Sequence, residues 1–91
     1  MKMFVVNLTY KKPLEEVDKF LSEHRIFLDK YYASKNIVVS GRKNPKIGGV
    51  ILCRFDSLDE VNQMIKEDAY YKNDVANYEV IEFEASRGIQ I

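Results

Sequence analysis

Apolar and β-branched residues are grouped along the chain into four runs that have the length of β-strands. Residues 2–9 and 47–55 are almost continuously apolar, which predicts two strands that are covered on both faces. Two shorter runs, at residues 36–40 and 78–84, predict two further strands. The chain should therefore contribute four strands, two of them central.

Two segments carry apolar residues at the three- and four-residue spacing of an amphipathic helix. The first covers residues 14–32 and follows Pro13, a residue that suits the first turn of a helix. The second begins after Ser57, whose hydroxyl can cap the helix together with Glu60, and it is predicted to end near Glu67. Each pattern predicts one apolar stripe that faces the core.

Turn-forming residues separate these segments. Residues 41–46 (Gly-Arg-Lys-Asn-Pro-Lys) are predicted to form a turn, and residues 68–74 an irregular or short helical connection. Gly48 and Gly49 lie inside a predicted strand, which indicates a bulge or a close approach of two backbones there.

The resulting order is β-α-β-β-α-β within a single domain, residues 1–91. That order predicts an α+β fold, a ferredoxin-like βαββαβ sandwich with a four-stranded antiparallel sheet and two helices on one face. The first and third strands are the most apolar, so they should be the central ones, with the second and fourth strands at the edges.

Both faces of the predicted central strands are apolar, although two helices can cover only one face. Phe4 and Val6 point to one side of the first strand, and Met3 and Val5 point to the other. An uncovered apolar face of roughly several hundred Å² is large enough for a partner to be expected. We therefore expect a homodimer packed sheet against sheet. The alternative is that long side chains and the C-terminal segment 86–91 cover this face.

Composition narrows the class of protein. The 14 basic and 14 acidic residues give no net charge, which disfavours a nucleic-acid partner because such binding depends largely on neutralising phosphates. No apolar run has the length of a membrane span, and residues 1–7 do not predict a signal peptide, so no membrane partner is expected. Cys53 is the single cysteine, which excludes an internal disulfide and a multi-cysteine metal site and favours the cytoplasm.

His24, the only histidine, lies in the apolar stripe of the first predicted helix. Its imidazole should face the sheet, where a histidine can act as a general acid or base. The alternative is a core histidine bonded to a backbone carbonyl. A catalytic histidine needs an orienting carboxylate. Asp29 is turned away on the helix, whereas Asp68, at the end of the second helix, is better placed. Asp68 can equally be a turn former, and the spacing does not decide between the two roles.

Other residues carry weaker signals. Cys53, on a central strand, is expected to be a small buried hydrophobe. Arg42, Lys43 and Lys46 can attract an anionic substrate or form a solvated hairpin tip. No spacing is typical of metal ligands or of a phosphate-binding loop, so neither a metal nor a cofactor is expected. Four tyrosines can line an aromatic ligand site or simply pack with a wet hydroxyl: Tyr31, Tyr32, Tyr70 and Tyr71.

Four motifs occur in order along the chain: Glu23-His24-Arg25, the turn Ser40-Gly41, the third strand ending in Phe55-Asp56-Ser57-Leu58-Asp59-Glu60, and the step Asp68-Ala69-Tyr70. On these motifs the chain resembles the YciI-like (YCII-related) family of small dimeric α+β proteins over nearly its whole length. At the position of Ala69 the family usually has a proline, and it often has a Gly-Pro turn where this chain has Gly41-Arg42.

The resemblance implies a ferredoxin-like dimer in which His24 and Asp68 form a pair that lines a small pocket. It also implies that some relatives catalyse elimination or isomerisation reactions of small ring compounds. The positions expected to bind the substrate are Ser40, Gly41, Tyr70 and Arg42.

Two functions follow from these residues. The first is a small enzyme of the lyase or isomerase type, in which His24 and Asp68 transfer a proton on a small organic, cyclic substrate. The alternative is a non-catalytic dimer of the same fold that binds a small molecule or has a regulatory role. An RNA-recognition domain shares the element order but needs exposed aromatic residues on its third strand. Phe55 is the only aromatic residue in the segment 47–55, so the RNA-binding function is disfavoured.

Overall fold

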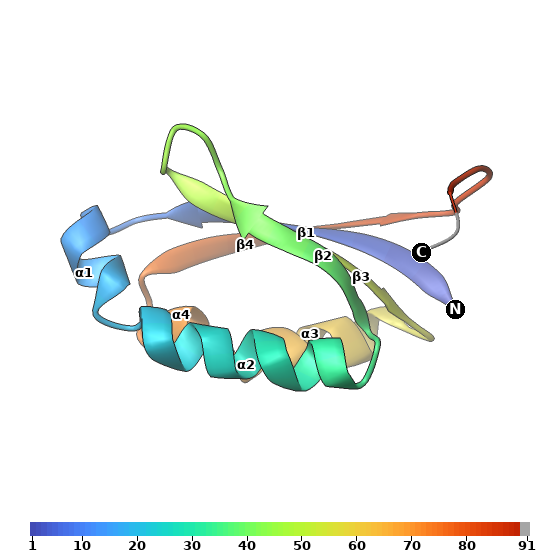
Figure 1. The fold of residues 1–91 in the computed structure, drawn as a ribbon, viewed down its shortest axis with the longest axis horizontal. Coiled ribbons are helices and arrows are strands. Elements are labelled where there is room, and N and C mark those ends of the chain that lie inside the picture. Colours follow the sequence, from blue (N-terminus) through green and yellow to red (C-terminus); the bar gives the residue numbers. More distant parts are fainter. Residues whose placement is uncertain (90–91) are drawn as a thin grey trace.

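A computed structural model describes residues 1–89, and residues 90 and 91 lie outside the described part of the chain. The four strands form one antiparallel sheet in the order β2-β3-β1-β4, so β1 and β3 are central as predicted. In chain order the elements are β1 (Lys2–Tyr10), α1 (Leu14–Asp18), α2 (Leu21–Ala33), β2 (Ile37–Arg42), β3 (Gly48–Phe55), α3 (Leu58–Lys66), α4 (Ala69–Lys72) and β4 (Ala76–Phe83) (Figure 1).

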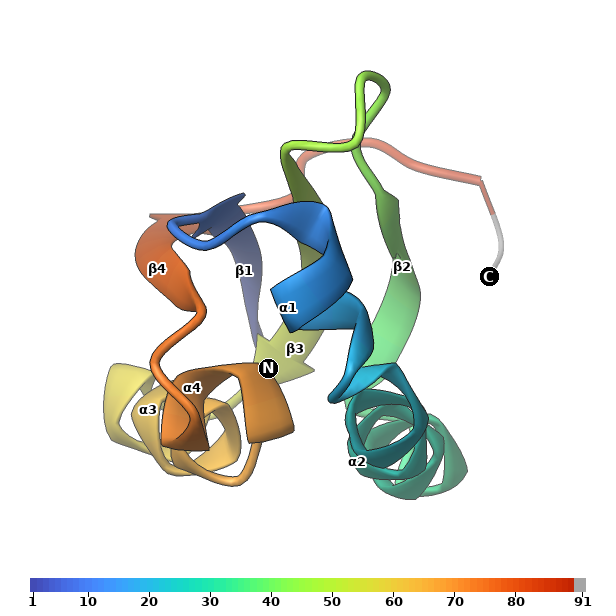
Figure 2. The same cartoon turned by 90° about the vertical axis from the view of Figure 1, so that its left-hand side faces the viewer.

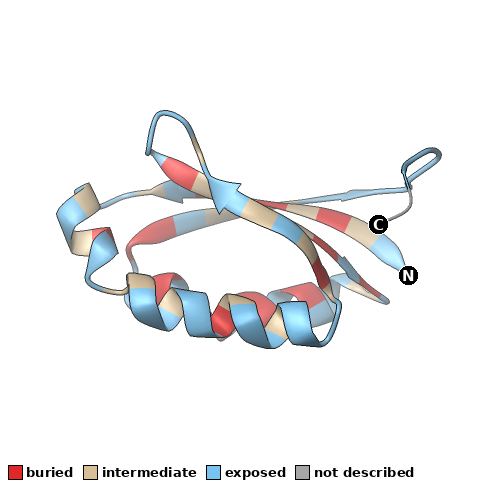
Figure 3. Ribbon diagram, viewed as in Figure 1, coloured by how far each residue is buried: buried red, intermediate tan, exposed pale blue. Residues whose placement is uncertain are grey.

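The helices α2 and α3 lie side by side on one face of the sheet, which confirms the predicted α+β layout (Figure 2). The core lies between these two layers (Figure 3). On β1 the buried residues alternate as predicted, because Phe4 and Val6 face the helices and are fully buried. Ile51 and Cys53 of β3 and Met64 of α3 complete this part of the core.

The predicted single helix over residues 14–32 is wrong, because the chain forms two helices there. The first, α1, ends at Asp18, and Phe20 precedes α2 with a non-helical backbone (φ −107°, ψ 8°). The break lets α1 close one end of the sheet, where Val17 is fully buried, while α2 runs along the face (Figure 2). A single straight helix could not both close the end of the sheet and run along its face.

Strand β2 is longer than predicted, because Gly41 and Arg42 continue the strand instead of forming the turn. The hairpin to β3 therefore begins at Lys43. Both added residues pair with β3, and Arg42 lies opposite Gly49. Pairing with a central strand adds ladder hydrogen bonds, and this long-range contact overrides the local turn preference of the segment.

A β-bulge interrupts β2. Ile37 lies opposite Cys53, whereas the next paired residue, Val39, lies opposite Leu52, so Val38 is an extra residue in the strand. An extra residue reverses the alternation of side chains beyond it. Ile37 faces the helices before the bulge, and Ser40 also faces the helices after it.

Gly48 marks the close backbone approach that the sequence predicts. A Cβ atom at this position would lie 1.9 Å from the carbonyl oxygen of Leu8 on β1, so only glycine fits. The neighbouring Gly49 is less restricted, because a Cβ there would be 3.1 Å from the carbonyl oxygen of Gly41.

The predicted cap of the second long helix is confirmed. The backbone N–H of Glu60 donates a hydrogen bond to Ser57 Oγ at 3.3 Å, and α3 then ends at Lys66. Asp68 caps the next helix in the same way, because its Oδ1 accepts from the backbone N–H of Tyr70 at 3.1 Å. Of the two forms predicted for residues 68–74, irregular or short helical, the structure has the short helix α4.

The face of the sheet opposite the helices carries apolar side chains that remain accessible. Val39 is 55% exposed and Ile81 50% exposed, and the register places Leu52 of β3 and Val5 of β1 between them, with Val50 two residues along β3. Residues 85–89 share a groove with Met3 at one end of this face, and they leave the other end open. Within the described chain, no helix combines the length and the apolar character needed to cross a bilayer.

Candidate functional site

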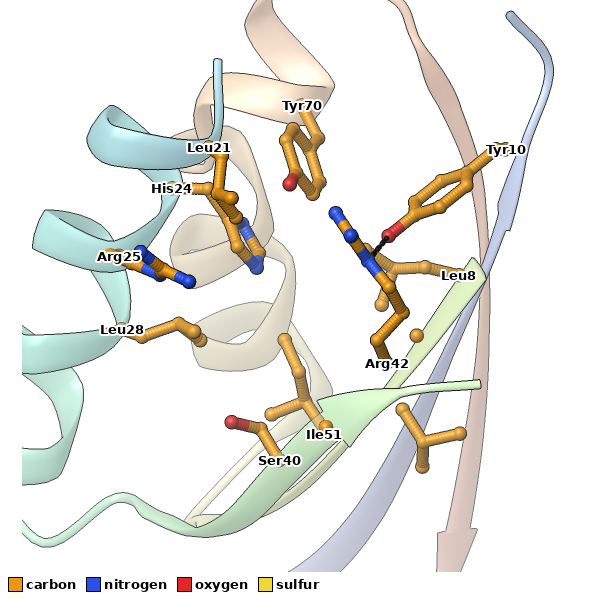
Figure 4. Close-up of a pocket in the computed structure, with 13 residues that line it drawn as sticks. Leu8, Tyr10, Leu21, His24, Arg25, Leu28, Ser40, Arg42, Ile51 and Tyr70 are labelled. Atoms are coloured by element: carbon orange, nitrogen blue, oxygen red, sulfur yellow. Dashed lines mark hydrogen bonds between the residues drawn. The ribbon is translucent and has the colours of Figure 1, made fainter. Parts of the chain in front are cut away.

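A cavity of about 320 Å³ lies between α2 and the sheet (Figure 4). Its walls come from α2, from the ends of β1 and β2, from the start of β3 and from the first turn of α4. Aliphatic side chains such as Leu8, Leu21 and Ile51 form much of the lining. The polar side chains that reach the cavity belong to His24, Arg25 and the residues Tyr10, Ser40, Arg42 and Tyr70.

His24 and Asp68 are in direct contact, although 44 positions separate them in the sequence. The distance between His24 Nδ1 and Asp68 Oδ1 is 2.6 Å. The imidazole is on the wall of the cavity, and the Asp68 side chain, fully buried, lies behind it. Because a carboxylate can only accept hydrogen bonds, Nδ1 carries the proton in this contact, and Nε2 is left for a ligand.

Three donors surround the Asp68 carboxylate. Besides His24, the Tyr78 hydroxyl donates to Oδ2 at 2.6 Å, and the backbone N–H of Tyr70 donates to Oδ1. Burying a carboxylate costs free energy of folding unless it is hydrogen-bonded in this way. Burial and the adjacent carboxylate raise the pKa of Tyr78 far above its usual value, so its hydroxyl remains a donor. The two roles that the sequence left open for Asp68 are therefore both present: it caps α4 and it contacts His24.

Tyr70 stacks on His24, with the ring centroids 4.0 Å apart and the planes at 7°. The Tyr70 ring also meets Tyr10 edge-on, at a centroid distance of 6.0 Å. Tyr70 is only 2% exposed, and its hydroxyl has no hydrogen-bond partner among residues 1–89. Burial raises the pKa of Tyr70 to about 12, which keeps this hydroxyl protonated.

Arg42 is held at the cavity by two contacts. Its Nε donates to the Tyr10 hydroxyl at 3.0 Å, and its Nη2 donates to Asp18 Oδ1 at 2.7 Å. The position of Asp18 depends on the helix break, because α1 ends at this residue. Of the two environments considered for Arg42, the structure places its side chain on the cavity wall instead of at the hairpin tip.

Ser40 and Gly41 also reach the cavity wall, from β2. The Ser40 hydroxyl is 2.6 Å from the hydroxyl of Tyr32. A Cβ atom at Gly41 would meet nothing within 4 Å, so packing does not require glycine at this position. All six residues singled out from the sequence therefore contribute to one region, five of them directly at the wall and Asp68 behind it.

Several other residues from the sequence analysis lie elsewhere. Tyr31 donates a hydrogen bond to Glu67 and packs against Phe55, away from the cavity. Tyr71 is half exposed and contacts the ring of Tyr78. Cys53 is buried in the core as predicted, and burial raises the pKa of its thiol to about 11. Tyr32, Lys43 and Lys46 are likewise not among the lining residues.

Sequence reasoning missed four residues that contribute to this region. Tyr10 continues the inward alternation of β1, so that pattern could have identified it. Tyr78 lies opposite Leu8 on β4, but the pairing register is needed to see this. Arg25 lines the cavity beside His24, and Asp18 anchors Arg42 across the helix break. No periodic signal points to either of these charged residues.

The fold and the cavity define a small α+β protein of the ferredoxin-like class, with a histidine on the wall of a partly open cavity. The YCII-related domain profile matches residues 3–84, and the chain belongs to this family. No curated protein matches the chain. A similar solved structure is 5-chloro-2-hydroxyhydroquinone dehydrochlorinase (TftG) from Burkholderia phenoliruptrix, in complex with 2,5-dihydroxybenzoquinone. Its TM-score is 0.75 at 18% identity, covering 94% of this chain and 95% of that one.

Proposed function

We propose that this protein is a small enzyme of the lyase or isomerase type, in which His24 moves a proton on a small cyclic organic substrate. The observation that carries the proposal is the 2.6 Å contact between His24 Nδ1 and Asp68 Oδ1, with the ring on the cavity wall. Asp68 holds Nδ1–H and thereby fixes the tautomer in which Nε2 bears the lone pair. A dehydrochlorinase of the same fold, bound to a quinone, supports a ring compound as the substrate.

In an elimination from a chlorinated hydroquinone, the reacting form is the keto tautomer, in which the carbon that carries chlorine is sp3. Nε2 of His24 takes the proton of a ring hydroxyl, the O–H electrons form a carbonyl, the neighbouring double bond shifts towards the carbon that carries chlorine, and chloride departs with its own electron pair. In an isomerisation, the same nitrogen takes a proton from one ring atom and returns it at another. Asp68 stabilises the imidazolium that forms in either case, because its buried carboxylate is already bonded to Nδ1. Ser40, Gly41, Tyr70 and Arg42 bind the substrate.

The test uses His24→Asn, because the asparagine amide can still donate to Asp68 but offers no second ring nitrogen. The assay follows chloride release from 5-chloro-2-hydroxyhydroquinone and related chlorinated hydroquinones. We expect turnover by the wild type and a loss of about 10²–10⁴-fold in the variant. Binding of 2,5-dihydroxybenzoquinone should change by less than about threefold. A wild type that binds the quinone without turning over any substrate would instead indicate the non-catalytic binding function.

We also propose that the protein is a homodimer through the open face of the sheet. Val39, Val50 and Ile81 are exposed there, and they lie on three different strands of the same face. Burying this apolar surface against a second copy would remove it from water, which is the usual driving force for association.

A further inference from the structure

The Tyr70 hydroxyl is the one buried side-chain polar atom without a hydrogen-bond partner among residues 1–89. A buried hydroxyl without a partner is costly, so native structures rarely keep one without a reason. The residue belongs to the cavity wall, and its ring is fixed on both sides by His24 and Tyr10. Its hydroxyl remains a neutral O–H donor near neutral pH, because burial raises its pKa to about 12. The Tyr70 hydroxyl therefore lacks an acceptor for its O–H group.

The neighbouring side chains do not supply that acceptor. The guanidinium of Arg42 lies beside Tyr70, and a guanidinium can only donate (Figure 4). Two N–H groups of Arg42 bond Tyr10 and Asp18, which anchors the guanidinium and turns further N–H donors towards Tyr70 and the cavity.

The charge of the wall points the same way. Arg25 also lines the cavity, on the other side of His24, and it forms no ion pair with any described residue (Figure 4). Within the described chain, no aspartate or glutamate lines the cavity, since Asp68 is behind His24 and Asp18 is engaged by Arg42. The wall that these residues form is therefore rich in donors and positive charge.

We infer that the cavity takes a small ring compound that carries an ionised oxygen, and that the Tyr70 hydroxyl and the Arg42 guanidinium hold that oxygen. The inference deepens the proposed function and rests on it only in placing the ring beside His24. An enolate, a phenolate and a carboxylate share the required chemistry. Tyr70 is then the residue that selects an anion, because its hydroxyl gains an acceptor only when such an oxygen is bound.

The test compares two quinones of similar shape. The acidic 2,5-dihydroxybenzoquinone carries ionised oxygens near neutral pH, whereas 2,5-dimethoxybenzoquinone is neutral. We expect the wild type to bind the acidic quinone at least about tenfold more tightly, as measured by absorbance titration. Tyr70→Phe should lose about tenfold in affinity for the acidic quinone and leave the affinity for the neutral one unchanged. Arg42→Met should reduce the same preference.

Stability provides an independent readout. Tyr70→Phe should leave the melting temperature unchanged or raise it, because the lost hydroxyl has no partner in the free protein. Tyr31→Phe is the matched control, since its hydroxyl bonds Glu67 outside the cavity. This control should lower the melting temperature and leave both affinities unchanged.

Equal affinity for the two quinones, no binding of the acidic one, or a Tyr70→Phe variant that binds the acidic quinone like the wild type would each overturn the inference. The proposed lyase or isomerase activity fails separately. If no chlorinated hydroquinone is turned over while the acidic quinone still binds in a Tyr70-dependent way, the anion site stands and the catalytic proposal does not.

Discussion

His24 and Tyr70 are aligned by a single carboxylate oxygen. Oδ1 of Asp68 lies 2.6 Å from His24 Nδ1 and accepts the backbone N–H of Tyr70 at 3.1 Å, while the two rings stack at 4.0 Å. The oxygen that caps helix α4 is thus the same atom that contacts the imidazole of His24. Substitutions at these three positions should therefore be coupled in their effects on stability.

The first prediction concerns the stability of His24 variants. His24→Ala removes a donor from buried Asp68 and a ring from Tyr70, so it should lower the free energy of unfolding by about 1–3 kcal/mol. Each kcal/mol corresponds to about 4–8 °C in melting temperature for a domain of this size. His24→Asn keeps an N–H donor and should recover part of this loss. Calorimetry of both variants checks this, and identical melting temperatures for the two would contradict it.

A second prediction concerns the buried network of Asp68. Asp68→Ala leaves the Tyr78 hydroxyl and the Nδ1–H of His24 without their acceptor, and it should cost about 2–4 kcal/mol. Tyr78→Phe removes one donor and should cost about 1 kcal/mol. The cost of the double variant should be less than the sum of the two, because Tyr78→Phe removes the hydroxyl that Asp68→Ala would leave without a partner. Urea unfolding of the three variants measures the coupling, and strict additivity would rule out the shared network.

Cys53 should be unreactive in the folded protein. Its side chain is fully buried on the central strand β3, and burial raises its thiol pKa to about 11. Because thiol reagents attack the thiolate, Ellman's reagent near neutral pH should label the native protein very slowly. The same reagent should modify one thiol per chain in denaturant. Rapid labelling of the native state would mean that the core opens readily around this residue.

Glu67 should make stability depend on pH in the acid range. Hydrogen bonds from Lys30 and then Tyr31 lower the pKa of Glu67. A lowered carboxylate pKa adds stability above the unfolded value of about 4.3, and this stability disappears as the pH falls through the folded value. The difference in melting temperature between the wild type and Glu67→Gln should therefore shrink as the pH falls from about 7 to about 3.

The control for this pH effect is Glu84→Gln, since Glu84 is exposed and has no ion pair with residues 1–89. Its melting temperature should follow the wild type at every pH. A difference for Glu67→Gln that stays constant over the whole range would show that shape, and not charge, is what matters at Glu67.

The proposed dimer predicts a mass of twice 10.7 kDa in light scattering. Val50→Lys places a charge on the open sheet face and should convert the protein to a monomer. Ile26→Lys is the control, because Ile26 is 69% exposed on α2, on the helical layer. A wild type with the mass of one chain, or a Val50→Lys variant that keeps the doubled mass, would refute the proposed interface.

The order of the elements and the central place of β1 and β3 could be predicted because both depend on local periodicity and on the length of apolar runs. The helix break at Phe20 could not be predicted in this way. Val17 and Phe20 continue the helical spacing, and the bend only becomes favourable once α1 has an end of the sheet to pack against. The extension of β2 through Arg42 likewise depends on pairing with β3.

The same distinction between local pattern and contacts between elements applies to the candidate site. The inward direction of His24 follows from its place in the apolar stripe of one helix. Its contact with Asp68 depends on how two helices pack, and spacing along the chain holds no information on that distance. That the Tyr70 hydroxyl lacks a hydrogen-bond partner could not be predicted from the sequence, because it depends on every side chain around the hydroxyl.

The extra residue at Val38 makes β2 tolerant of changes in length. Ile37 is anchored to the core, and the residues from Val39 onward are positioned by β3, so the bulge absorbs the difference between the two registers. Loss of Val38 would leave a regular strand in which Ser40 and Arg42 still face inward. We therefore expect this chain to tolerate the loss of one residue between α2 and the cavity, because the same side chains would continue to line the cavity wall.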